Sequence, residues 1–220
     1  MSRRRWLWVV AVFGLSVLGA LPARWFGGLL PVQVQGLSGS LWHGQARQLG
    51  DVGPLSWQWQ PWRLYAEANA GFQGQNWQLS LSGWPWNWRA TLEPQPLRGT
   101  LASGYRLSGD WQGRVELQGA GSTCTAAQGQ LRVSQLALSA PWSLALGESS
   151  LHVDCSNGLH LLGQLSLAGQ HQAELDADLL ARRAQLRGRV EPGAALQPVL
   201  LSARWLAPES TELERTLTWR

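Results

Sequence analysis

The feature that most constrains the fold is a two-residue alternation of apolar and polar side chains. It is clearest in six runs, at 31–35, 55–60, 77–82, 114–118, 130–134 and 159–167. Successive side chains of a strand point to opposite faces, so each run predicts a strand with one apolar face and one face of Gln, Ser, Arg or Glu. Glycines that recur at short intervals predict the turns of an antiparallel meander.

Two later segments are ambiguous between helix and strand. In 173–183 the alternation of Leu175, Ala177 and Leu179 favours a strand, whereas 209–217 stays a weak helix candidate. No Ser/Gly-rich linker and no run of charges divides the chain after Pro22. We therefore expect residues 23–220 to form one mainly β domain, built on a long, twisted antiparallel sheet.

The N-terminus has a different pattern. Arg3, Arg4 and Arg5 precede an uncharged stretch from Trp6 to Leu21, and a proline follows. This pattern predicts a basic flank and a single transmembrane helix within residues 1–22. Sixteen residues reach about 24 Å against a hydrocarbon core of about 30 Å, which makes the span short.

The basic flank also predicts the orientation. Positive flanks stay in the cytoplasm, so the β domain should face the periplasm from the inner membrane of a Gram-negative cell. A cleaved signal peptide needs small residues before the cut, but Leu18 and Leu21 occupy those positions in the two candidate sites. Retention is therefore favoured, and a twin-arginine export signal remains an alternative.

Charge argues against a nucleic-acid partner. Removing the three arginines of the flank from the 18 basic residues leaves 15 against 14 acidic residues. A nucleic-acid surface needs clustered cations, and the short arginine run at 182–189 is accounted for by a solvated strand or turn.

The two cysteines, Cys124 and Cys155, both lie in the segment expected in the periplasm. An oxidising compartment favours a disulfide between them over two free thiols. Two unrelated buried thiols are an alternative. A metal site is another, with His152, Asp154 and His160 beside Cys155, although no short metal-ligand spacing supports it.

Tryptophan placement is the second unusual feature of the composition. Trp57 and Trp59 are two residues apart, as are Trp84, Trp86 and Trp88, so within a strand each set shares one face. The rings can fill a sheet face, line a groove for a lipid chain or a partner, or stack on sugars.

Two different environments are expected for these rings. Trp57 and Trp59, together with Trp42, are expected in the core. Trp84, Trp86 and Trp88 are expected to be accessible, as a candidate interaction edge. Pro85 cannot donate a ladder hydrogen bond, so it marks an edge strand, a bulge or a turn, of which the edge is favoured.

No catalytic pattern stands out. There is no nucleophile elbow, no zinc-protease motif and no phosphate-binding glycine loop. The four histidines, at 43, 152, 160 and 171, fit ordinary surface or edge positions of strands and turns. The sequence therefore predicts neither an enzyme nor a cofactor site.

One stretch resembles a known family. The run Gly39-Ser40-Leu41-Trp42-His43-Gly44, followed by Trp57-Gln58-Trp59-Gln60-Pro61, is similar to the signatures of the type II secretion system protein N family. The resemblance is densest over residues 20–65. The two glycines are expected to bracket a strand around one large aromatic side chain, Trp42, beside Leu41.

The resemblance implies a function and a fold. It implies an accessory inner-membrane component of the machine that exports folded exoproteins across the outer membrane, with other components of that machine and the membrane as partners. It also implies a fold similar to AsmA-like proteins, whose half-open sheets have an apolar inner face. Lipid handling in such a groove, with lipid as a further candidate partner, is the alternative function.

Overall fold

The computed structural model describes residues 33–50, 52–96, 106–140 and 143–219, together with Trp6, Trp8, Val9, Phe13 and Gly14. Most of the expected span from Trp6 to Leu21, including its end at Leu21, lies outside the described residues. Across these described positions, no helix has the length and apolar character needed to cross a membrane.

Strands dominate the described chain. Their bounds are β1 Val34–Gln35, β2 Ser38–Gly39, β3 His43–Ala46, β4 Gln48–Leu49, β5 Leu55–Gln60, β6 Tyr65–Phe72, β7 Gln75–Trp84, β8 Asn87–Gln95, β9 Arg106–Ala120, β10 Thr123–Ala140, β11 Leu144–Asp154, β12 His160–Leu167, β13 His171–Asp178, β14 Arg183–Val190 and β15 Glu212–Thr218. A 3₁₀ turn, η1 Pro61–Arg63, joins β5 to β6, and a short helix, α3 Gln197–Ser202, precedes β15.

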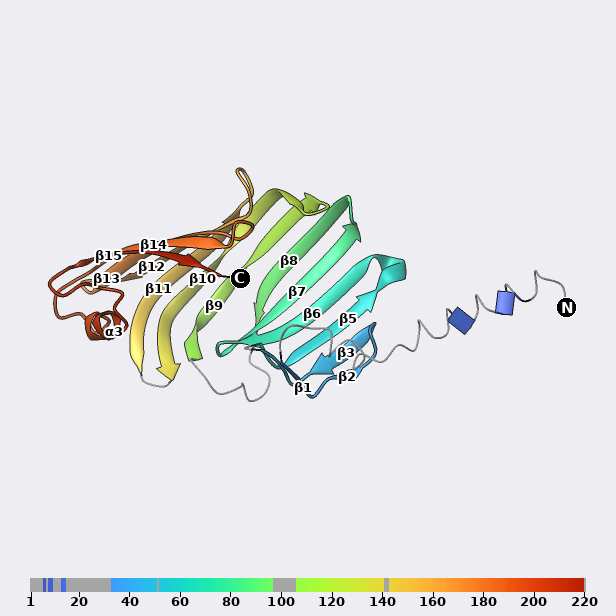
Figure 1. Ribbon diagram of the computed structural model, residues 1–220, viewed down its shortest axis with the longest axis horizontal. Coiled ribbons are helices and arrows are strands. Elements are labelled where there is room, and N and C mark those ends of the chain that lie inside the picture. The colour runs from blue at the N-terminus through green and yellow to red at the C-terminus, as the bar shows by residue number, and fades with distance from the viewer. Residues whose placement is uncertain are drawn as a thin grey trace.

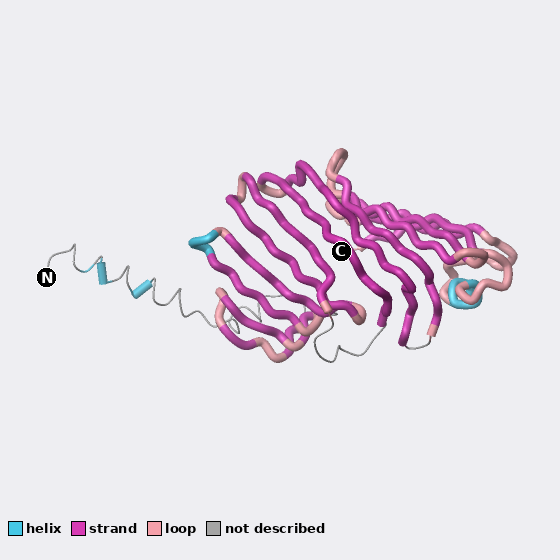
Figure 2. Tube along the Cα trace, turned by 180° about the vertical axis from the view of Figure 1, so that it is seen from behind, coloured by secondary structure: helices cyan, strands magenta, loops and turns pink. Residues whose placement is uncertain are grey.

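Thirteen of these strands form one antiparallel sheet in almost sequential order. The order is β15-β14-β13-β12-β11-β10-β9-β8-β7-β6-β5-β3-β2, and β1 pairs with β4 in a separate ribbon. Figure 1 shows the long strands side by side in a twisted layer, with α3 beside the last strands, and Figure 2 shows that layer from behind. The long antiparallel sheet that the alternation predicts is confirmed.

The register separates the two faces. One row of paired residues runs Trp57, Ala68, Leu79, Leu92 and Val115 across five neighbouring strands. The adjacent row on the opposite face runs Gln58, Glu67, Ser80, Thr91 and Glu116. Antiparallel partners share a face, so the sheet has an apolar face and a polar face.

Burial on the apolar face is uneven. Leu131 and Val133 of β10 are buried, whereas Leu79 and Leu81 of β7 are exposed. At the β14–β15 end, α3 and the loops around it close a small core of Val190, Ala194, Leu200, Leu206 and Leu213. Packing is therefore concentrated in the C-terminal half of the described sheet.

Several local expectations need correction. The helix candidate at 209–217 is the edge strand β15, while 173–183 does contain the expected strand, β13. Not every glycine marks a turn: Gly163 lies inside β12, within the strand expected at 159–167, where a Cβ would come within 2.9 Å of the Leu151 side chain. A glycine can thus mark a position where a side chain of the neighbouring strand packs close to the backbone, as well as a turn.

Candidate functional site

The segment from Gly39 to Gly44 forms a tight hairpin. Gly39 of β2 pairs with Gly44 of β3. The backbone N–H of Ser40 donates to the carbonyl of His43 at 2.8 Å, and the Ser40 hydroxyl accepts from the His43 N–H at 3.2 Å. Gly39 has a φ of 91°, in the left-handed region that favours glycine. The expectation that the glycines bracket a single strand is therefore wrong, because they face each other across the hairpin.

Gly44 makes room for the ring of Trp57 on the next strand. The two residues are register partners, and a Cβ at residue 44 would overlap the indole ring. The indole Nε1 donates to the carbonyl of Leu41, at the hairpin tip, at 3.1 Å. The ring thus lies against a glycine backbone with its polar atom satisfied, which is how a half-buried tryptophan avoids an unpaired donor.

Trp88, on β8, repeats this arrangement three strands away from Trp57 on β5. It pairs with Gly119 of β9, and a Cβ there would overlap the Trp88 ring. Its Nε1 donates to the carbonyl of Gly121, in the β9–β10 turn, at 3.0 Å. Sequence reasoning missed both pairings, because the glycine that faces each tryptophan becomes visible only when the strand register is known.

The prediction of a core position is wrong for Trp59. Its side chain is 42% exposed, although its ring centroid lies 5.2 Å from that of Trp42. Trp42 and Trp57 are half-buried. Among the described residues no second layer packs over this part of the sheet. The alternation therefore predicts the face on which Trp59 lies, but it does not predict that this face stays exposed.

Trp84 and Trp86 are accessible, as the sequence predicts. They are 52% and 67% exposed, and their rings stack at 5.0 Å with an interplanar angle of 9°. Trp88 is half-buried. The favoured expectation of an edge strand is wrong, because both β7 and β8 have neighbours on each side. The alternative of a turn is confirmed, because Pro85 lies in the turn between these strands.

An apolar groove lies on the apolar face beneath these turns. It encloses about 460 Å³. Its lining comes from β5 to β8, from the connections of these strands and from the β9–β10 turn: Trp59, Leu64, Tyr65, Ala66, Leu81, Gly83, Pro85, Trp88 and Gly121. Such a surface can hold an acyl chain or an apolar side chain of a partner, and it has no polar group suited to chemistry.

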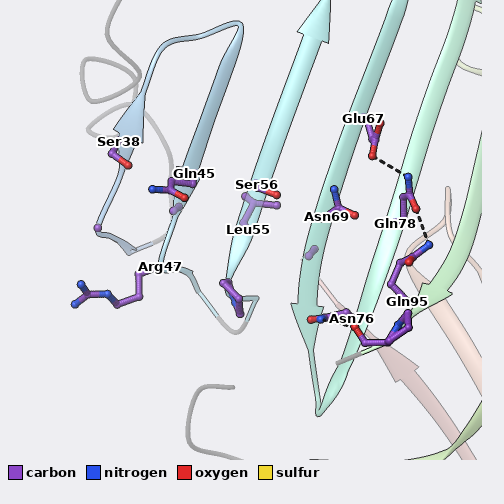
Figure 3. Close-up of a pocket in the computed structure, with 15 residues that line it drawn as sticks. Ser38, Gln45, Arg47, Leu55, Ser56, Glu67, Asn69, Asn76, Gln78 and Gln95 are labelled. Carbon is purple, nitrogen blue, oxygen red and sulfur yellow. Dashed lines mark hydrogen bonds between the residues drawn. The ribbon is translucent and has the colours of Figure 1, made fainter. Parts of the chain in front are cut away.

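A second, polar groove lies on the opposite face of strands β2 to β8. It encloses about 810 Å³, and Figure 3 shows its amide and hydroxyl side chains on neighbouring strands. Gln78 donates to Glu67 Oε1 at 2.8 Å, and Gln95 donates to Gln78 Oε1 at 2.6 Å. The Tyr65 hydroxyl also donates to Glu67, at 3.0 Å. The pKa of Tyr65 is raised by partial burial and then by this carboxylate.

Two other side chains of the polar groove are available to a ligand. Asn69 and Gln45 are exposed and are without side-chain partners among the described residues. The groove can therefore hydrogen-bond an extended peptide or a hydroxyl-rich ligand. It contains no pair of groups positioned for acid or base catalysis.

The predicted disulfide is present. Cys124 and Cys155 are bonded, with their Cα atoms 5.6 Å apart. Cys124 lies at the start of β10 and Cys155 directly after β11, so the bond joins neighbouring strands at the end of the sheet opposite to their own connecting turn.

The histidines do not gather into a site. His160 Nδ1 lies 2.8 Å from Asp176 Oδ1, and the hydrogen bond raises the pKa of His160. His171 is buried, with Nε2 3.1 Å from the Leu146 carbonyl. Within the described ranges no group of three or more His, Cys, Asp or Glu side chains could hold a metal ion.

Comparison with known proteins identifies one family. A family model described as type II secretion system (T2SS), protein N, matches residues 31–207, which is most of the chain and nearly all of the sheet. No curated protein and no solved structure matches. The chain therefore belongs to the type II secretion system protein N family.

Proposed function

We propose that this protein is an accessory inner-membrane component of the type II secretion machinery, which supports the export of folded exoproteins across the outer membrane. The observation that carries the proposal is the family match over residues 31–207. It spans the strands that form both grooves and every strand of the sheet except β15, so nearly the whole sheet belongs to the part that the family shares.

The sheet suits a binding role. Its grooves offer an apolar surface on one face and an array of hydrogen-bonding side chains on the other. Neither contains a catalytic grouping, so the proposed work is contact with other components of the machinery. We assign that contact to the apolar groove, because a bound partner would remove its exposed aromatic and leucine side chains from water.

The proposed anchor is the segment from Trp6 to Leu21. At its described positions Trp6, Trp8, Val9 and Phe13 are each more than 60% exposed, as expected of side chains that face lipid. The basic flank supports a periplasmic position for the sheet. A periplasm-active reporter fused after Arg220 should be active and a cytoplasm-active reporter silent, and the reverse pattern would contradict this orientation.

A secretion assay tests the function. Deletion of the gene should leave exoprotein in the periplasm, and the wild-type chain should restore release. A Trp59→Gln, Leu81→Gln variant should restore less release than a Phe72→Gln control, because Phe72 is similarly exposed but lies away from the apolar groove. Normal secretion in the deletion strain would refute the proposal.

Lipid handling is the second candidate function. The specific observation that favours it is the row of exposed apolar side chains on β5 and β7, Trp59, Leu79 and Leu81, above an open groove. Native mass spectrometry of the full-length protein should then find bound phospholipid, and Leu81→Gln should reduce it. Bound lipid with unimpaired secretion in the deletion strain would favour this candidate over the first.

A further inference from the structure

Three exposed tryptophans lie at one end of the sheet. Alternate connections of a sequential antiparallel sheet lie at the same end, so η1 and the β7–β8 turn are neighbours there. Trp62 of η1 is 75% exposed, and Trp84 and Trp86 of the β7–β8 turn are also exposed. We refer to Trp62, Trp84 and Trp86 as the tryptophan rim. Large apolar side chains exposed in a cluster mark an interaction surface.

Backbone hydrogen bonds hold the rim together. The N–H of Gly83 donates to the carbonyl of Leu64 at 3.0 Å, which ties the end of β7 to the β5–β6 connection. The N–H of Gly121 donates to the carbonyl of Pro85 at 2.7 Å, which ties the same turn to the β9–β10 connection. The exposed rings are therefore carried by three linked connections, and the apolar groove opens beside them.

The three connections that form the rim carry charge of one sign. The segments 60–65, 82–90 and 118–125 contain Arg63 and Arg89 and no Asp or Glu. Both arginines are exposed, and neither has an ion-pair partner among the described residues. Tryptophan with unpaired arginine is the composition of surfaces that sit in the headgroup region of anionic membranes.

We propose that the tryptophan rim docks on the surface of the membrane in which the N-terminus is anchored, with its rings at the headgroup level and Arg63 and Arg89 beside anionic lipid. This proposal rests on the anchor of the proposed function. Docking would place the mouth of the apolar groove against the bilayer, where a partner or a lipid chain could enter it.

The geometry allows the rim to reach that membrane. β1 and β4 lie at the other end of the strands, near the β6–β7 turn, where Gly53 N–H bonds to the Gly71 carbonyl. From Leu21 to Val34 the chain can extend about 45 Å. The ten residues of β7 span about 33 Å. The connecting segment is therefore long enough for the sheet to fold back and present its rim to the bilayer.

Fluorescence of a label on the rim tests the docking. The full-length protein carrying Trp86→Cys is labelled with an environment-sensitive dye, which reacts only there because the native cysteines are bonded to each other. It is reconstituted in vesicles of phosphatidylethanolamine and phosphatidylglycerol with nitroxide-labelled acyl chains. Insertion to the depth of an interfacial group should quench roughly half of the fluorescence. A Trp62→Cys label should behave alike, and a Phe72→Cys label at the opposite end should be quenched far less.

Lipid charge provides the second readout. In the same assay Arg63→Gln and Arg89→Gln should each shift the docking equilibrium about fivefold toward the undocked state. Phosphatidylcholine vesicles remove the attraction for both arginines at once, so they should shift it by the product of the two effects, about 25-fold. Equal quenching at positions 86 and 72, or none at 86 and 62, would overturn the proposal.

The outcomes separate docking from the proposed function. Loss of secretion in Trp84→Gln, Trp86→Gln without any quenching at the rim would mean that the rim binds a protein, which overturns membrane docking and leaves the secretion role intact. Quenching at the rim with normal secretion in the deletion strain would leave docking intact and refute the secretion role. Loss of vesicle association altogether would remove the anchor on which docking rests.

Discussion

At the scale of single residues, two tryptophans are held by glycines on neighbouring strands. Gly44 with Trp57 and Gly119 with Trp88 combine a missing Cβ with an indole N–H bonded to a turn carbonyl. A methyl group at residue 44 must displace the ring or the backbone beside it. Gly44→Ala should therefore lower the free energy of unfolding by about 1 to 3 kcal/mol. Urea denaturation measures this, with exposed Gln58→Ala as the control, and equal midpoints would contradict the overlap.

The protonation of His160 should respond to a neighbouring carboxylate. Its hydrogen bond to Asp176 favours the charged imidazolium and raises its pKa, with Asp178 and Asp154 adding to the effect. The raised pKa means that this pair stabilises the fold fully below the unfolded histidine pKa of about 6.5, and that the contribution is lost as pH rises through the folded value.

Replacing the partner should reverse that shift. Asp176→Asn should lower the pKa of His160, because the neutral amide no longer favours the charged ring. NMR titration of the ring protons measures the change. Glu174→Gln, on the same face of β13, serves as the control and should leave the titration almost unchanged. An unaltered titration in Asp176→Asn would mean that the hydrogen bond does not form in solution.

At the scale of elements, the disulfide fastens β10 to β11 where they have no connecting turn. It closes a loop with a sequence separation of 31, worth about 3 to 4 kcal/mol in the chain-entropy picture. Replacing both cysteines with serine should therefore lower stability by about 2 to 5 kcal/mol. Thermal melts with and without reductant measure it. Reductant should destabilise the wild type and leave the serine variant unchanged.

Sequence reasoning described the strands better than their connections. The run at 55–60 is β5 to the residue, because its alternation is uninterrupted. The Gly39 to Gly44 segment was misjudged as a single strand, since its hairpin depends on Ser40 bonding back to His43. Helix α3 was not foreseen because six residues are too few to show a helical period.

At the scale of the whole molecule, alternation defines the two faces but not what covers them. Leu131 and Leu81 occupy the same apolar face and have the same sequence pattern, yet Leu131 is buried and Leu81 is 44% exposed. The difference depends on the twist of the sheet and on long-range packing, which the local pattern does not contain. The candidate grooves were equally hidden, because they join residues from several strands.

This uneven cover predicts uneven sensitivity to mutation. Leu131→Ala removes a buried side chain and should cost about 2 to 5 kcal/mol. Leu81→Ala removes a side chain that is already half in water, so its cost should be below about 1.5 kcal/mol. Urea unfolding of both variants measures the difference, with similar slopes expected. Equal losses would mean that in solution something covers the β7 end of the apolar face, and the apolar groove would then be closed rather than open to a partner.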